Sequence, residues 1–510
     1  MLPADWLVMA LYFGLMVIIG IWSFRQVKDT QDFFAAGGKM PWWLSGISHH
    51  MSGYSAAVFV AYAGVAYEYG FTLYVWWAVP ISLAVFLGAI YIAPRWSRLR
   101  QRLSVESPME YLAVRYNVPT QQLMAWSGVL LKIFDVGAKW AAIAVILNVF
   151  AGVPITAGII LSGLISLFYI TIGGLWADAL TDFAQFVVQL VAGAAMFIIV
   201  VDKLGGIQSI PGLWDRLPPE HSAPFAGPYT IGFVLAYLLI GFLSYNGGTW
   251  NLAQRFIAAP KGSDARKAAF LSAALYLIWP LILFFPMWAA PLFFPSLEDP
   301  TQSYSVMAKE LLPPGLVGLV LASMFAHTMA MTTSDANAIT AVVTRDIMPV
   351  ISGKFRGLKG KPALRAARIT TVAFILFTLI VAMNAGTFGG ILDLLIVWFG
   401  ALVGPASVPM ILGLLPLFRH SDATAAIVSW AGGISAFAVV KYVFESGTAT
   451  TVAAPVLVSA ILFILIGWLK RKQEVKPEVS AFIDSLNDDS ENGHASNRST
   501  DDRSSTHFPF

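Results

Sequence analysis

A run of polar residues interrupts the second long apolar segment of this chain. The run reads Ser48-His49-His50-Met51-Ser52-Gly53-Tyr54-Ser55 and has apolar residues on both sides. An unpaired polar group in hydrocarbon costs several kcal/mol, so such a run cannot face lipid. Membrane helices are interrupted in this way where freed backbone groups bind a solute or an ion. The run therefore predicts a binding site at mid-membrane depth.

A second polar interruption lies in the seventh apolar segment and reads Ser244-Tyr245-Asn246-Gly247-Gly248-Thr249. The two interrupted segments are five apart, and this odd offset makes them cross the membrane in opposite directions. Paired interruptions in two inverted halves are typical of secondary transporters, whose binding sites lie between the halves. A single interruption could be a simple kink, but two at matching places favour a shared binding site.

The sixth apolar segment carries four polar residues at helical spacing, namely Asp178, Asp182, Gln185 and Gln189. This spacing places them on one stripe of a helix. Two carboxylates on an interior stripe suit hard cations, which prefer oxygen ligands, or proton exchange. Asp178 could simply be hydrated near the cytoplasmic end, whereas Asp182 lies one turn deeper and is the stronger candidate for a cation ligand.

The ninth segment also combines titratable and hydroxyl groups on one face, with His327, Ser334 and Asp335. Histidine titrates near neutral pH and can pass protons. The sequence therefore predicts a possible proton relay, formed by His49, His327, Asp335 and Asp178.

The fourth segment places Lys132, Asp135 and Lys139 on one stripe. Such a basic–acidic–basic stripe can neutralise its own charges, and a long lysine can reach the interface. We favour this structural interpretation over a role in binding a substrate anion.

Other kinds of chemistry find little support. Cysteine is absent, which excludes disulfides and thiolate sites. His49, His50 and His327 lack the spacing of a metal site, and no phosphate-binding glycine loop or catalytic triad order stands out. We therefore predict that the protein is not an enzyme and has no organic cofactor.

The composition identifies the elements that must position these residues. The chain of 510 residues is 57% hydrophobic and only 12% charged, about half the charged fraction of a soluble protein. Apolar runs long enough to span a bilayer predict thirteen helices. They lie near 5–24, 43–66, 72–94, 121–150, 153–172, 177–201, 229–256, 267–292, 314–340, 368–387, 390–415, 421–442 and 451–469. The prediction is an all-α polytopic membrane protein.

Lysine and arginine concentrate in alternate connections between these segments. The richest stretch is 345–368, whereas the opposite set of loops offers only Lys203, Arg216 and Lys309. Because basic loops stay in the cytoplasm, the helices are predicted to cross the cytoplasmic (inner) membrane with the N-terminus on the outer side and the C-terminus on the cytoplasmic side. Residues 475–506 are rich in Ser, Asp, Asn and Glu, which predicts a disordered tail.

Several stretches resemble the sodium:solute symporter family, which includes bacterial proline and sugar cotransporters and the animal sodium/glucose cotransporters. The most specific is Gly173-Gly174-Leu175-Trp176-Ala177-Asp178-Ala179-Leu180-Thr181-Asp182-Phe183-Ala184-Gln185. Similar stretches are 32–38, 254–259 and 344–347, and the resemblance covers roughly residues 5–470. It implies a LeuT-type core of two inverted five-helix repeats.

On this resemblance the chain divides into six parts. These are a peripheral first helix and loop (1–42), the first repeat (43–201), an extracellular loop (202–228), the second repeat (229–415), peripheral helices (416–472) and the disordered tail (473–510).

The resemblance also implies a sodium site between the first and eighth core helices. Counting without gaps from Asp346, its positions here are Ser48, Met51, His327, Ala330 and Met331, with Asp182 available for a second cation site. The family usually has hydroxyls where this chain has Ala330 and Met331. A two-residue shift would bring Thr332 and Thr333 there, but a gap inside a membrane helix is awkward, so we prefer the ungapped count.

The solute-binding residues implied by the resemblance surround the two interruptions. They are His50, Ser52, Gly53, Tyr54, Tyr245 and Asn246. His50 and the nearby lysines would suit an anionic or zwitterionic solute.

The predicted function is secondary transport of a small organic solute across the lipid bilayer by alternating access, driven by sodium. One alternative is a proton-coupled or uncoupled carrier of the same fold, because the missing hydroxyls and the nearby histidines weaken the case for sodium. A second alternative is a membrane solute sensor that does not transport. Neither nucleic acid nor an obligate protein partner is predicted.

Overall fold

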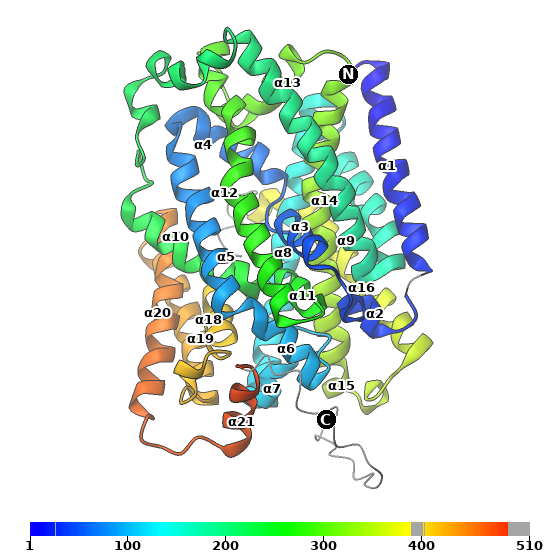
Figure 1. Cartoon of the computed structure of the whole chain (residues 1–510), viewed down its shortest axis with the longest axis vertical. Coiled ribbons are helices and arrows are strands. Elements are labelled where there is room, and N and C mark those ends of the chain that lie inside the picture. The colour runs from blue at the N-terminus through cyan, green and yellow to red at the C-terminus, as the bar shows by residue number, and fades with distance from the viewer. Residues whose placement is uncertain (26, 389–400, 402, 488–510) are drawn as a thin grey trace.

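The computed structural model describes residues 1–25, 27–388, 401 and 403–487. The described residues form helices joined by turns and loops, without a β-strand. Figure 1 shows an elongated bundle in which α1 (Pro3–Phe24) begins at one end of the long axis and α21 (Pro477–Ser485) lies toward the other end.

Both predicted interruptions are confirmed as breaks in the helical backbone. The second segment consists of α3 (Trp42–Met51), an irregular stretch with one 3₁₀ turn, and α4 (Ala61–Tyr69). The seventh consists of α10 (Ile231–Leu243), a π-helical turn at Ser244–Gly248, and α11 (Asn251–Ala258).

Backbone conformation explains the second break. Gly247 has φ +125°, and Trp250, three residues later, has φ +68°, values that a helix does not contain.

Helix α9 (Ile155–Lys203) contains the predicted fifth and sixth segments, which meet at a kink. The kink lies at Gly174, whose φ is +55°. A Cβ atom there would lie 2.6 Å from the carbonyl oxygen of Phe33. Glycine is therefore required both for the backbone conformation and for the close approach of α2 (Thr30–Ala35). The kink positions the turn that carries Asp178 and Asp182.

The core of the bundle is made of long helices packed around the broken ones. Helix α14 (Leu316–Val342) packs against α9 and α8 (Val118–Ala151), and α12 (Gly262–Phe293) packs against α3 and α5 (Val79–Tyr91). Helix α16 (Gly360–Met383) covers α8. Helix α1 (Pro3–Phe24) lies against α9 and α14, while α19 (Ala423–Ala438) pairs with α20 (Thr448–Leu469). In Figure 1, α1 and the α19–α20 pair lie at opposite sides of the bundle.

The described residues contain fewer identifiable membrane-spanning helices than the thirteen that were predicted. Within the described ranges, nine helices are long and apolar enough to cross a membrane, or up to ten if a bent pair counts as one span. The broken second segment falls short of this test because its two halves are separate short helices. Most of the predicted segment 390–415 lies outside the described residues, although α18 (Gly404–Leu412) marks its end. Thirteen spans therefore remains a prediction.

The predicted disorder of residues 473–510 is wrong for its first part. Residues Pro477–Ser485 form helix α21, and Phe482, Ile483 and Leu486 near its end are buried. The prediction failed because it rested on the average composition of the whole stretch, which is polar. That average does not reveal three apolar residues at helical spacing. Residues 488–510 lie outside the described part.

The kink gives a first test. Substituting Gly174→Ala should lower thermal stability by an amount on the order of 1–3 kcal/mol, because alanine is strained at positive φ and its Cβ meets Phe33. The control is Gly14→Ala in α1, where a Cβ has no heavy atom within 4 Å. It should be neutral or slightly stabilising. Equal melting temperatures of the two purified variants would contradict this account.

Candidate functional site

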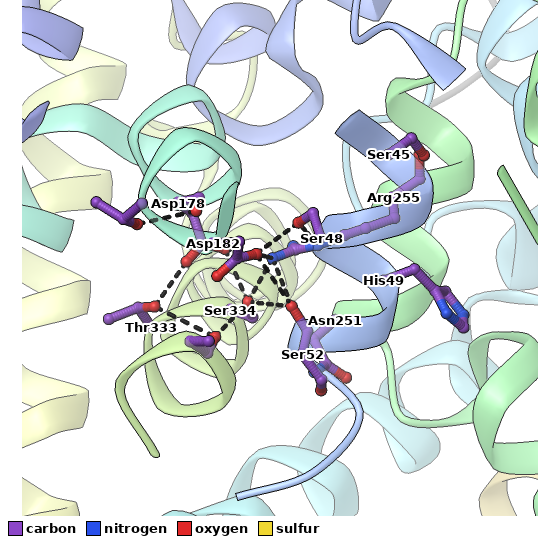
Figure 2. A network of polar contacts seen from close by, with 12 residues as sticks. Ser45, Ser48, His49, Ser52, Asp178, Asp182, Asn251, Arg255, Thr333 and Ser334 are labelled. Carbon is purple, nitrogen blue, oxygen red and sulfur yellow. Dashed lines mark hydrogen bonds and ion pairs between the residues drawn. The ribbon is translucent and has the colours of Figure 1, made fainter. Parts of the chain in front are cut away.

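Arg255 on α11 is the centre of a buried polar network between the broken helices and the bundle (Figure 2). Its Nη2 donates to Asp178 Oδ2 at 2.5 Å, Asp182 Oδ2 at 3.3 Å and Ser52 Oγ at 3.0 Å. Its Nε donates to Ser48 Oγ at 2.9 Å, and Ser48 Oγ donates in turn to Asp182 Oδ2 at 2.5 Å. The network therefore joins α3 and α11 to α9.

Charge in this network is not balanced. Asp178, Asp182 and Arg255 are all fully buried, and among the described residues Arg255 alone forms ion pairs with the two carboxylates. When both carboxylates are ionised, one negative charge is left over. Among the described residues, none forms a hydrogen bond with Asp182 Oδ1. A buried carboxylate oxygen without a partner is costly, so this atom marks where a cation or a proton would be stabilised.

Helix α14 contributes hydroxyl groups to the same network. Thr333 Oγ1 donates to Asp178 Oδ1 at 2.6 Å, and Ser334 Oγ donates to Asp178 Oδ2 at 2.8 Å. Ser334 also lies 2.8 Å from Ser52 Oγ and contacts Arg255. These two hydroxyls lie three residues after Ala330 and Met331, whereas Thr332 of the two-residue shift donates to the Thr328 carbonyl of its own helix at 2.7 Å.

The predicted ion-site positions on α3 and α14 lie close to this network. Ala330 and Met51 belong to one small apolar cluster, and the Ala330 carbonyl accepts from Ser334 Oγ at 2.6 Å. Met331 is only half-buried. Ser48 and Asp182 contact each other directly, whereas the His327 side chain bonds to its own helix, with Nδ1 lying 2.7 Å from the Ser323 carbonyl.

The two helix breaks face each other. Tyr245 Oη donates to the Gly53 carbonyl at 2.8 Å, and Asn251 Nδ2 donates to the Ser52 carbonyl at 3.1 Å. Tyr276 Oη donates to the His50 carbonyl at 3.1 Å. The carbonyls that the interruption frees on α3 thus have partners on the second broken segment and on α12.

The predicted solute-binding residues lie in three different environments. His50, Gly53, Tyr54 and Tyr245 stay around the first break, where Tyr54 Oη lies 3.0 Å from His50 Nε2. Ser52 belongs to the Arg255 network. Asn246 donates to the carbonyls of Ala84 and Phe242, at 3.0 and 2.8 Å.

The four predicted relay residues have separate environments. His49 is bonded on both sides, with Nδ1 2.7 Å from Ser272 Oγ and Nε2 2.9 Å from the Tyr245 carbonyl. In Figure 2 its ring points away from the Arg255 network. Asp178 belongs to that network and Asp335 to another. Among the described residues no hydrogen bond links these four groups to one another, so the relay stays a prediction.

The lysines of α8 belong to a second buried network, in which Asp335 of α14 supplies the carboxylate that the stripe itself lacks. Lys139 Nζ lies 2.7 Å from Asp135 and 2.6 Å from Asp335, and Lys132 contacts Asp335 and lies 3.6 Å from Asp135. All four side chains are buried. Two positive and two negative charges balance, so the lysine charges are not left to attract the anionic solute that we expected.

Sequence reasoning missed Arg255 and Tyr276 as site residues. Gln254-Arg255 entered the interpretation only as part of a family-like stretch, although an arginine within an apolar run is itself a signal. Tyr276 gave no signal, because one tyrosine in an apolar helix is ordinary. Thr333 and Ser334 were recognised on the right helix but not as partners of Asp178.

Comparisons with known proteins agree with this geometry. Residues 33–432 match the sequence model of the sodium:solute symporter family. The sodium/sialic acid symporter NanT of Aliivibrio fischeri is 24% identical over 476 residues, which cover 90% of this chain and 91% of the relative. The sodium/glucose cotransporter of Vibrio parahaemolyticus is 24% identical over 378 residues, covering 67% and 68% of the two chains.

A solved structure shares the fold. It is the substrate-bound, outward-open state of a Na⁺-coupled sialic acid symporter, described as revealing a novel Na⁺ site. It superposes with a TM-score of 0.81 at 20% identity and covers 91% of this chain and 97% of that chain. The LeuT-type fold expected from the sequence is therefore confirmed.

The lysine–aspartate network gives a second test. Substituting Asp335→Asn leaves two lysines with one carboxylate and should destabilise the protein by about 3–5 kcal/mol, because an unpaired charge stays buried. The double substitution Lys132→Met with Asp335→Asn keeps the charge balanced and should recover most of the loss. Thermal unfolding of the purified variants measures both effects, and a double variant no more stable than the single one contradicts charge balance as the cause.

Proposed function

Because this chain belongs to the sodium:solute symporter family, we propose that it imports a small organic solute together with a cation, most favourably sodium. The transporter works by alternating access in the cytoplasmic membrane, with the N-terminus outside and the C-terminus inside. The solute occupies the region of the two helix breaks, next to His50, Gly53, Tyr54 and Tyr245.

The observation that carries cation coupling is the uncompensated charge at Asp182. Its free Oδ1 offers a negative ligand inside the protein, where a monovalent cation would restore neutrality. Oxygen atoms of Ser48, Ser52, Thr333 and Ser334 lie in the same network and are the ligand type that sodium prefers. Sodium therefore fits better than the sequence alone suggested.

The position of the network explains how a cation would drive transport. It joins the broken helices α3 and α11 to the long helices α9 and α14. A cation at Asp182 would therefore lie between the broken helices and the long ones. A ligand shifts a conformational equilibrium only by binding one state more tightly than another. Bridging these helices is a direct way for a cation to do so.

Proton coupling remains the alternative, because protonation of Asp182 would also remove the extra charge. A non-transporting sensor is the other alternative. The same network could bind a cation in such a sensor, and only movement of solute across a sealed bilayer separates the two.

The coupling ion is tested by thermal unfolding of the purified protein in sodium, potassium or choline chloride. Sodium should stabilise the wild type, by about 2.7 kcal/mol at roughly 100 times its Kd, and Asp182→Asn should abolish this effect. The control is Asp215→Asn at an exposed position of the short 3₁₀ helix Pro211–Arg216, and this variant should respond like the wild type.

Stabilisation by low pH without any difference between the three salts would reject sodium in favour of the proton. Lack of response to both ions would reject coupling at Asp182. For transport itself, proteoliposomes should exchange radioactive sodium across the sealed bilayer, and binding without exchange would indicate a sensor.

A further inference from the structure

The net charge of the buried network bears on how many cations the protein binds, as well as on which cation it binds. We infer that Arg255 is a fixed internal cation that sets how many external cations the network binds. The inference rests on the proposed function, because it assumes that Asp182 takes part in cation binding.

The geometry holds the guanidinium firmly inside the network. Arg255 is fully buried, and its Nη2 lies 2.5 Å from Asp178 Oδ2. Its backbone is held separately, since Ser45 Oγ donates to the Arg255 carbonyl at 2.8 Å. An arginine side chain keeps its charge in proteins, so it supplies one permanent positive charge at this place.

The permanent charge leaves one carboxylate to be neutralised. Asp178 is paired closely with Arg255 and accepts from Thr333 and Ser334, so its oxygens are used. Asp182 is 3.3 Å from Arg255 and keeps Oδ1 free. One external cation, bound at Asp182, then makes the network neutral.

The number of bound cations should therefore follow the net charge of the three side chains. Removing the arginine charge leaves two negative charges, which call for one more cation. Removing the charge of Asp178 as well returns the network to a single negative charge. Removing the charge of Asp178 alone makes the network neutral, so it has no excess charge for a cation to compensate.

This arithmetic is tested by counting radioactive sodium bound per molecule of purified protein at alkaline pH, where carboxyl groups ionise. Arg255→Gln should bind one more sodium ion than the wild type, and Arg255→Gln with Asp178→Asn should bind as many as the wild type. Asp178→Asn alone should bind one fewer. Arg255→Lys is the matched control and should leave the count unchanged.

An unchanged count in Arg255→Gln overturns the inference, and so does a raised count in Arg255→Lys. If Arg255→Gln does not fold, the loss of one ion in Asp178→Asn and its return in the double variant decide the question. A wild type that binds no sodium would instead contradict the proposed coupling, which keeps the two failures distinct.

A different observation concerns helix α21, which docks at the end of the bundle opposite the start of α1 (Figure 1). Ile483 and Leu486 are fully buried there. Arg98 Nη1, on α6 (Ala93–Leu103), donates to the Leu486 carbonyl at 2.6 Å, and Arg95 Nη2 donates to Asn487 Oδ1 at 2.5 Å. Arg419 pairs with Asp484 at 3.1 Å.

A row of aromatic side chains connects α21 with the second helix break. The Phe482 ring stacks on Tyr111 of α7 (Tyr111–Arg115), with centroids 6.3 Å apart. Tyr111 meets the edge of Trp96 at 5.6 Å, and Trp96 Nε1 donates to the Asn246 carbonyl at 2.8 Å. A Cβ on Gly247 would lie 2.8 Å from the Trp96 ring, so the ring closely covers the break.

We propose that α21 is a latch that stabilises the conformation described here. While docked, it holds α6 and α7 against the second break and keeps that end of the transporter closed. Release of α21 would remove the support of Tyr111 and Trp96 and allow the break to open toward that end. The latch is a conformational device separate from the cation count.

The natural absence of cysteine allows a direct test. Ser407 is buried beside Gly248 at the break, so Ser407→Cys introduces a single thiol that reports opening. Adding Ile483→Asp should release α21 and raise the rate of maleimide labelling about tenfold, as expected for a shifted equilibrium. Ala481→Asp adds the same charge on the exposed face of α21 and should leave the rate unchanged.

Phe482→Ala provides a second variant without a buried charge and should give an intermediate rate. Equal labelling rates for Ile483→Asp and Ala481→Asp overturn the latch, and if Ile483→Asp does not fold, an unchanged rate in Phe482→Ala does so. Because labelling needs neither sodium nor solute, it tests the latch independently of the coupling mechanism.

Discussion

The requirement that buried charges be paired governs the arrangement of this protein. In a membrane-spanning bundle, water cannot solvate a carboxylate or a guanidinium at depth, so each must find partners on neighbouring helices. Arg255 meets this requirement with groups from three other helices, reaching Ser48 on α3, Asp178 on α9 and Ser334 on α14. The packing of the broken helices against the bundle therefore depends on one side chain and its partners.

Two buried charge networks share α14, but they differ in balance. Asp335 joins Lys132 and Lys139 in a neutral set, which ties α14 to α8. Asp178 and Asp182 share one arginine, which leaves an excess negative charge on the face toward α3 and α11. A neutral network has no electrostatic reason to bind or release an ion, whereas an unbalanced one does. This difference separates a structural tie from the cation site that we propose at Asp182 of α9.

Several features followed correctly from local sequence. The all-helical membrane class, both interruptions and the polar stripe of α9 were predicted because each depends on residues close together in the chain. Periodicity and hydropathy report on such residues directly. The stripe of Lys132, Asp135 and Lys139 was correctly interpreted as structural, but by itself it keeps one positive charge in excess. Its partner Asp335 was placed in a relay because nothing local links helices α8 and α14.

The sequence by itself determined that the chain crosses a membrane, where its helices break and which helices carry titratable groups. Only the tertiary structure decided that Arg255 lies between Asp178 and Asp182, that Thr333 and Ser334 supply the hydroxyls, and that α21 docks. The physical reason is that hydropathy acts along the chain, whereas charge pairing depends on distances of a few ångströms between helices far apart in sequence. Such distances are set by how the helices pack.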